Sequence, residues 1–170
     1  LADVMIIATQ DRQHVPHALA ALDKGYHLLL EKPISPDLAE CRALERKALE
    51  TGRAVVVCHV LRYTRFYAAL SDLLRRGEIG KIETIDAVEH VAYWHYAHSF
   101  VRGNWRRSDE TSPMILAKSC HDMDILRWLA GERCLRVQSF GALDHFRREN
   151  APQGAALRCL DGCARKKDCP

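Results

Sequence analysis

Apolar residues in the first third of the chain fall into short runs separated by longer amphipathic stretches. The runs at residues 4–9, 27–31 and 54–58 are rich in Val, Ile and Leu and too short for helices, which predicts three buried strands. Residues 14–24 and 36–51 carry apolar side chains every three or four positions, so we expect helices between the strands. This order predicts right-handed βαβ units and one half of a doubly wound, parallel α/β sheet covered on both faces.

Turn-forming residues set the expected limits of these two helices. Gly25 and Gly52 follow the last apolar position of each helix, where a glycine commonly ends one. Ser35-Pro36-Asp37 predicts the start of the second helix, with Ser35 as the N-cap and Pro36 as the first helical residue.

Beyond residue 59 the pattern becomes that of a mixed α and β region. Residues 82–91 and 135–143 combine β-branched residues with charged or alternating positions, which predicts strands of an antiparallel sheet with one face in water. Residues 65–76 and 113–130 predict helices. The apolar face expected for the first of these helices consists of Phe66, Leu70, Leu73 and Leu74. Residues 93–111 are polar and aromatic without a clear period, and predict a loop.

Composition and charge narrow the class of protein. Of the 170 residues, 48% are hydrophobic, so the chain can bury a core. The net charge of +3 at pH 7 comes from scattered residues, which argues against a nucleic-acid or membrane partner. No apolar stretch approaches the roughly 20 residues that cross a bilayer, and the start lacks a signal-peptide pattern, so we expect a cytoplasmic protein. The chain starts with Leu1 rather than Met, directly before a strand, which favours an internal piece of a longer polypeptide.

The residues after each predicted strand are the first candidates for chemistry, because ligands of open parallel sheets bind beyond the carboxyl ends of the strands. These residues include Thr9, Asp11, Glu31-Lys32-Pro33 and residues 59–63. Helix capping is an equally good explanation for Thr9 and Asp11. Lys32 could simply close a strand at the surface, but the neighbouring proline stiffens its backbone, as a positioned proton donor or carbonyl-polarising group requires.

A second group of candidates lies in the predicted helix at residues 113–130. Lys118, His121 and Asp124 are three residues apart, so on a helix they project to roughly one side. Histidine exchanges protons near neutral pH, and the charged neighbours Lys118, Asp122 and Asp124 favour a functional role for His121 over a structural one. Asp124 could serve only to orient the ring.

Several short motifs follow one another at characteristic spacing. They are Ala8-Thr9 with His14, Glu31-Lys32-Pro33, Arg62-Tyr63, Gly77-Glu78-Ile79-Gly80, Trp105-Arg106, His121-Asp122-Met123-Asp124 and Trp128-Leu129-Ala130-Gly131. Each motif alone is weak. In this order, over residues 1 to about 145, they resemble the Gfo/Idh/MocA oxidoreductases.

The resemblance implies a domain organisation. Residues 1–59 would be the C-terminal half of an NAD(P)-binding Rossmann domain. Residues 60–170 would be an incomplete substrate-binding α/β domain with a largely antiparallel open sheet, which in the family often forms the oligomer interface. We therefore expect NAD or NADP as the cofactor, a sugar or polyol as the substrate, and a homo-oligomer.

The resemblance also implies roles for particular residues. Those expected near the cofactor are Thr9, His14, Glu31, Lys32, Pro33 and Arg62, with a cis bond between Lys32 and Pro33. Lys32 would contact both nicotinamide and substrate and polarise the reacting oxygen. His121 would act as acid and base during hydride transfer between the nicotinamide and a hydroxyl-bearing carbon.

Two features depart from the family pattern. Many members carry an aspartate four residues before the histidine, in a glycine-rich turn, whereas here Ala117 and Ser112-Pro113 stand in those places and Lys118 follows. Lys118 would then contact an acidic substrate or take over proton handling. The sequence also has no Gly-x-Gly-x-x-Gly, so the phosphate-binding half would precede Leu1, and we expect the chain alone to bind dinucleotide weakly, which a tight calorimetric titration would contradict.

Cysteines cluster near the end of the chain, within a region from residue 146 that we expect to be irregular. Cys159, Cys163 and Cys169 could be three ligands of a zinc or iron–sulfur site. Their spacing does not match the usual two-residue knuckle and a fourth ligand is not evident. Free thiols or a redox pair remain alternatives, so the sequence leaves the metal undetermined.

Two other functions remain open beside that of a dehydrogenase. One is a non-catalytic relative that binds a sugar or nucleotide, which Ala117 would fit. The other is a family member that uses NAD as a redox relay to cleave glycosides. The aromatic residues at 93–107 suit either a sugar pocket or ordinary packing, so the sequence does not identify the substrate.

Overall fold

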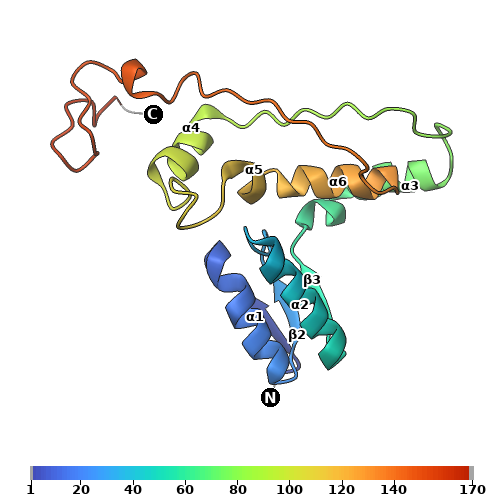
Figure 1. Ribbon diagram of the computed structural model, residues 1–170. Coiled ribbons are helices and arrows are strands. Elements are labelled where there is room, and N and C mark those ends of the chain that lie inside the picture. The colour runs from blue at the N-terminus through green and yellow to red at the C-terminus, as the bar shows by residue number, and fades with distance from the viewer. Residues whose placement is uncertain (1, 169–170) are drawn as a thin grey trace.

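The computed structural model describes residues 2–168, and the chain begins with a parallel α/β unit (Figure 1). The strands β1 (Val4–Ile7), β2 (His27–Leu30) and β3 (Val55–Val57) pair in the order β1-β2-β3. The helices α1 (His14–Asp23) and α2 (Leu38–Thr51) connect them and contact one another. The βαβ units predicted from the sequence are therefore confirmed.

The core of this unit lies between the sheet and the two helices. Its buried residues are Ile7, Val15, Ala18, Ala21, Leu22, Leu28, Leu30 and Leu44. The opposite face of the sheet is not covered by the described residues, since Ile6 is 68% exposed. Our expectation of cover on both faces is thus wrong for this part of the chain. Successive right-handed crossovers in the same direction place both helices on one face.

The start of α2 differs from the prediction by two residues. Asp37, not Ser35, is the N-cap, and its carboxylate accepts a hydrogen bond of 2.7 Å from the N–H of Ala39. Ser35 accepts a hydrogen bond of 3.0 Å from the N–H of Asp37 and so stabilises the turn before the helix. At the other end, Gly52 adopts the left-handed conformation, with φ of 63°, and ends the helix as predicted.

The second region is mostly helical in the part of the chain that the structure describes. Its elements are η2 (Val60–Tyr63), α3 (Arg65–Arg75), α4 (Tyr93–Tyr96), the π-helical turn η3 (Ala97–Arg102), α5 (Met114–Ala117), α6 (Cys120–Ala130) and the short turn η4 (Arg148–Asn150). The helix predicted at 113–130 is interrupted between α5 and α6, and the loop predicted at 93–111 is partly helical. Over residues 146–168, the irregular structure expected at the end of the chain is confirmed apart from η4.

The antiparallel sheet expected in this region does not form among residues 2–168. Residues 82–91 and 135–143 run as extended segments beyond the helices without strand pairing (Figure 1). Alternating residues form a strand only where a neighbouring strand satisfies their backbone N–H and C=O groups. Most apolar side chains of the two segments are exposed to water, as Val88 at 69% and Phe140 at 88% exposure show.

The predicted inward face of α3 is only partly buried. Leu70 and Leu74 are half-buried, whereas Phe66 and Leu73 are exposed, because no neighbouring layer covers that face. None of the helices formed by the described residues is long and apolar enough to cross a membrane.

Candidate active site

Lys32 reaches from the end of β2 toward the second region. Its ammonium Nζ donates a hydrogen bond of 2.9 Å to the main-chain carbonyl of Ala117, at the end of α5. The peptide bond between Lys32 and Pro33 is cis, as the resemblance implies. The carboxylate of Glu31 accepts a hydrogen bond of 3.1 Å from the N–H of Lys32. The carboxyl end of the strand therefore presents the lysine to the break between α5 and α6.

His14 lies beneath this turn rather than open to solvent. The ring is 1% exposed, with Nδ1 2.7 Å from the carbonyl oxygen of Pro33 and Nε2 3.0 Å from that of Thr9. These oxygens follow β2 and β1, so one buried imidazole links the two strand ends. The hydroxyl of Thr9 lies 3.3 Å from Nδ1 of His17.

Two imidazoles meet where the two regions join. His59 follows β3 and His121 lies in the first turn of α6, and their ring centroids are 5.9 Å apart in an edge-on arrangement, with 83° between the planes. Nδ1 of each ring is buried and has no hydrogen-bond partner among the described residues. The structure thus pairs the predicted acid/base residue with a second histidine.

The environment of these rings favours their neutral form. Burial lowers the pKa of His121 below its usual value, and the positive charges of Lys32 and Lys118 act in the same direction. Burial also lowers the pKa of His59, opposed by Asp124 and reinforced by Arg62 and Lys32. A neutral ring can accept a proton, which is what a general base in this position requires.

Arg62 and Asp124 connect the segment after β3 to the helix that carries His121. The guanidinium donates hydrogen bonds of 2.6 and 2.5 Å to the two carboxylate oxygens. It also lies over the ring of Trp128, 5.5 Å from the centroid. The hydrogen bond to Asp124 raises the pKa of Arg62. Among the described residues Asp124 binds Arg62 and has no hydrogen bond to the His121 ring, so the structure gives no support to the suggestion that this carboxylate orients the ring.

Lys118 occupies the interruption between α5 and α6, next to the carbonyl that receives Lys32. Its Nζ lies 3.3 Å from a carboxylate oxygen of Glu89. Its positive charge lowers the pKa of His121, which lies three residues further along the chain. The structure therefore gathers the residues expected to be catalytic, Lys32, Lys118 and His121.

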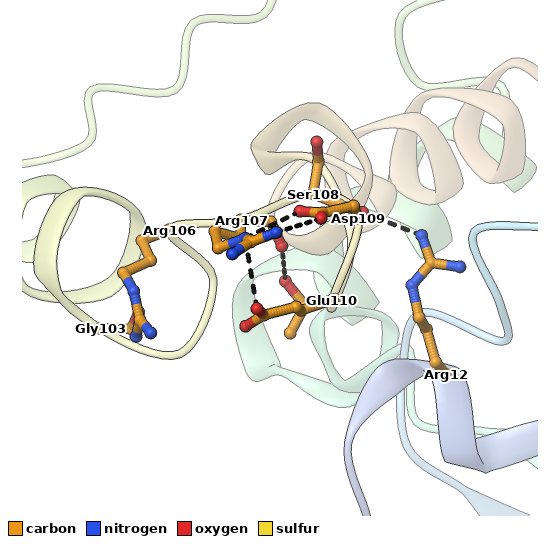
Figure 2. Close-up of polar contacts among 8 residues, drawn as sticks. Arg12, Gly103, Arg106, Arg107, Ser108, Asp109 and Glu110 are labelled. Atoms are coloured by element: carbon orange, nitrogen blue, oxygen red, sulfur yellow. Dashed lines mark hydrogen bonds and ion pairs between the residues drawn. The ribbon is translucent and has the colours of Figure 1, made fainter.

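The polar segment after η3 docks on the first α/β unit. Arg12 donates a hydrogen bond of 2.9 Å to the carbonyl of Ser108. Figure 2 shows the neighbouring Arg107 paired with the carboxylates of Asp109 and Glu110. The indole N–H of Trp105 donates a bond of 3.0 Å to the carboxylate of Asp11, which is 3% exposed. These contacts hold the segment near the carboxyl end of β1.

Sequence reasoning missed the pairing of His59 with His121 and that of Asp11 with Trp105. The position of His59 and Asp11 just after strands marked both as residues to inspect. Nothing in the local pattern identified their partners.

The predicted cysteine cluster is only partly described by the structure. Cys159 and Cys163 fall in the irregular C-terminal region, and Cys169 lies outside the described residues. Between residues 2 and 168, no group of three or more His, Cys, Asp or Glu side chains could hold a metal ion.

Comparison with known proteins identifies relatives of this chain. Inositol 2-dehydrogenase 4 of Saccharopolyspora erythraea is 32% identical over 155 residues, covering 89% of this chain and 41% of that protein. The 1-carboxy-3-chloro-3,4-dihydroxycyclo hexa-1,5-diene dehydrogenase of Comamonas testosteroni is 25% identical over 163 residues, covering 95% of this chain and 40% of that protein. The chain spans about two fifths of the length of these relatives.

The fold has solved counterparts. A crystal structure of an oxidoreductase domain protein from Kribbella flavida superposes with a TM-score of 0.65 at 24% identity, covering 78% of this chain and 36% of that one. Residues 1–59 match the oxidoreductase family with an NAD-binding Rossmann fold, and residues 67–161 match the GFO/IDH/MocA C-terminal domain. Since the second match alone covers more than half of the sequence, the chain belongs to the Gfo/Idh/MocA family of oxidoreductases.

Proposed function

We propose that the protein containing this chain is an NAD(P)-dependent dehydrogenase that transfers a hydride between nicotinamide and a hydroxyl-bearing carbon of a sugar or polyol. The observation that carries this proposal is the convergence of Lys32, His59 and His121 where the strands end and α6 begins. The relative from Saccharopolyspora erythraea is named an inositol 2-dehydrogenase, which supports a polyol as the substrate class.

The residues at the strand ends fit the nicotinamide end of such a cofactor. In parallel α/β sheets the cofactor lies beyond the carboxyl ends of the strands, where Thr9, Glu31, Lys32 and Pro33 are found. Nδ1 of His59 and of His121 is buried and lacks a partner among the described residues, so a ligand bound here would meet the Nε2 side of each ring. When bound, the nicotinamide supplies the two-electron hydride acceptor or donor.

Each side chain of the site then has a role that follows from its position. Lys32 would donate a hydrogen bond to the reacting oxygen and polarise it, since among residues 2–168 its ammonium is held only by the main-chain carbonyl of Ala117. His121 would accept the hydroxyl proton in oxidation and return it in reduction, because burial keeps the ring neutral. His14 and Arg62, proposed from the resemblance to lie near the cofactor, would act through the strand ends and through α6 respectively.

Lys118 could add specificity to this site. Its positive charge lowers the pKa of His121, and its ammonium is paired with Glu89, a half-exposed carboxylate. A substrate that carries its own carboxylate would compete with Glu89 for this cation. The dehydrogenase from Comamonas testosteroni has a name that specifies a carboxylated substrate, which supports testing acidic sugars beside neutral ones.

The test is a substrate panel on the full-length protein. Formation of reduced nicotinamide would be followed by absorbance with neutral polyols, sugars and their acids, for the parent and for Lys32→Met. We expect turnover of at least one substrate and a loss of roughly 10²-fold or more in the variant. Lys81→Met, which changes an exposed lysine paired with Glu83, is the matched control and should keep full activity.

Other outcomes would point to the alternatives. Binding of a sugar or nucleotide with no turnover of any substrate would refute the dehydrogenase and favour a binding protein. Release of a glycosidic leaving group without net nicotinamide reduction would favour NAD-dependent glycoside cleavage.

A further inference from the structure

We propose that His59 is a second substrate-binding residue, which together with His121 recognises two oxygens on adjacent carbons of the substrate. This inference rests on the proposed dehydrogenase function and specifies its substrate class as a vicinal diol or the corresponding hydroxy ketone. The sequence marked residues 59–63 as candidates by their position after a strand, but only the structure pairs His59 with His121.

The geometry of the pair is the first support. The two rings come from different regions of the chain, one after β3 and one from α6, and meet edge-on with centroids 5.9 Å apart. Nδ1 of each ring is buried and lacks a partner among residues 2–168. Nε2 is therefore the nitrogen left in each ring to exchange a hydrogen bond with a ligand.

The charges around the pair are the second support. His121 faces Lys32 from the end of β2, Lys118 from the break before α6, and Asp122 from α6 itself. The charges that act on His59 are those of Asp124, Arg62 and Lys32, and the first two form an ion pair with each other. A second positive charge beside Lys32 is unfavourable, and a charged ring would also bury an N–H without an acceptor. Both imidazoles are thus held as neutral groups.

Two neutral imidazoles side by side match a diol better than a single hydroxyl. A neutral ring can donate or accept through its accessible nitrogen, as a hydroxyl can. Hydrogen bonds of about 2.8 Å from the two rings can converge on oxygens carried by adjacent carbons. The oxygen that meets His121 and Lys32 would be the reacting one, and His59 would hold its neighbour.

The consequence is discrimination against substrates that lack the neighbouring hydroxyl. A deoxy analogue would leave the polar group of His59 without a partner in a half-buried site. Loss of one such hydrogen bond corresponds to roughly ten- to hundredfold in kcat/KM.

The experiment compares a cyclic polyol with its deoxy analogue in the full-length protein and in His59→Phe. Phenylalanine supplies an aromatic ring beside His121 but has no ring nitrogen to bond the substrate. We expect kcat/KM for the diol to fall roughly ten- to hundredfold in the variant. The value of kcat/KM for the deoxy analogue should fall far less. His59→Gln, which restores a hydrogen-bonding group, should recover part of the discrimination between the two substrates. His90→Phe, at an exposed position, should leave kcat/KM unchanged for both.

A binding measurement without turnover gives an independent readout. In ¹⁵N spectra of the imidazole rings, the diol should shift the Nε2 resonances of both His59 and His121, whereas the deoxy analogue should shift mainly that of His121. The proposal would be overturned if His59→Phe lowered kcat/KM equally for both substrates. It would also be overturned if the ring resonances of His59 did not shift when the diol is added. Absence of turnover by the parent protein with every substrate would instead refute the dehydrogenase function itself.

Discussion

Replacing Asp124 by Asn tests whether its contact with Arg62 holds α6, and therefore His121, against the first α/β unit. The carboxylate receives two charge-assisted hydrogen bonds, of 2.6 and 2.5 Å, from a residue 62 positions earlier. Removing its charge leaves the guanidinium over Trp128 with a weaker, neutral partner. The variant keeps the size of the side chain, so that loss of charge is the main change.

The magnitude follows from the exposure of the two side chains. Fully exposed ion pairs contribute about 0.2–1 kcal/mol, and breaking a buried pair costs about 3–5 kcal/mol. The side chains of Arg62 and Asp124 are 35% and 13% exposed, so solvent screens this pair only in part. We therefore expect Asp124→Asn to lower the free energy of unfolding by about 2 kcal/mol.

Urea unfolding followed by tryptophan fluorescence measures this change, because Trp128 lies directly beneath Arg62. Asp72→Asn is the matched control, since Asp72 is 49% exposed and pairs with arginines of its own helix region, Arg75 and Arg76. The control should cost less than about 1 kcal/mol. Arg62→Lys should cost nearly as much as Asp124→Asn, because lysine cannot form the two-pronged contact. Equal unfolding midpoints for Asp124→Asn and the control would refute the reasoning.

Three further predictions concern other parts of the structure. Trp105→Phe should lower stability by about 1–3 kcal/mol, because the buried carboxylate of Asp11 loses its indole donor, and an unchanged melting temperature would contradict this contact. Since the folded-state pKa of both His59 and His121 lies below 6.5, the unfolded state binds more protons, and stability should fall as the pH decreases below about 6.5. His121→Phe should flatten that dependence in chemical unfolding at a series of pH values. Gly52→Ala should cost about 1 kcal/mol, measured in the same way, because its φ of 63° strains a residue with a Cβ.

The sequence alone determined the first α/β unit and part of the site. Short apolar runs and amphipathic spacing are local properties, so they predicted β1, β2 and β3 and the helices between them. Leu28 and Leu30, inside one such run, are buried in the core as expected. The position of Lys32 after a strand and the charged neighbours of His121 marked these residues as chemical candidates before any contact was known.

Only the tertiary structure decided which side chains meet. Asp11 and Trp105 are 94 residues apart, Arg62 and Asp124 are 62 apart, and His59 lies equally far from His121. Local periodicity carries no information on such pairs, since they depend on how helices and strand ends pack. The same limit explains why residues 82–91 and 135–143 form no paired strand although their sequence pattern suits one. A strand exists only where another segment accepts and donates its backbone hydrogen bonds, and that partner is decided by the packing of the chain.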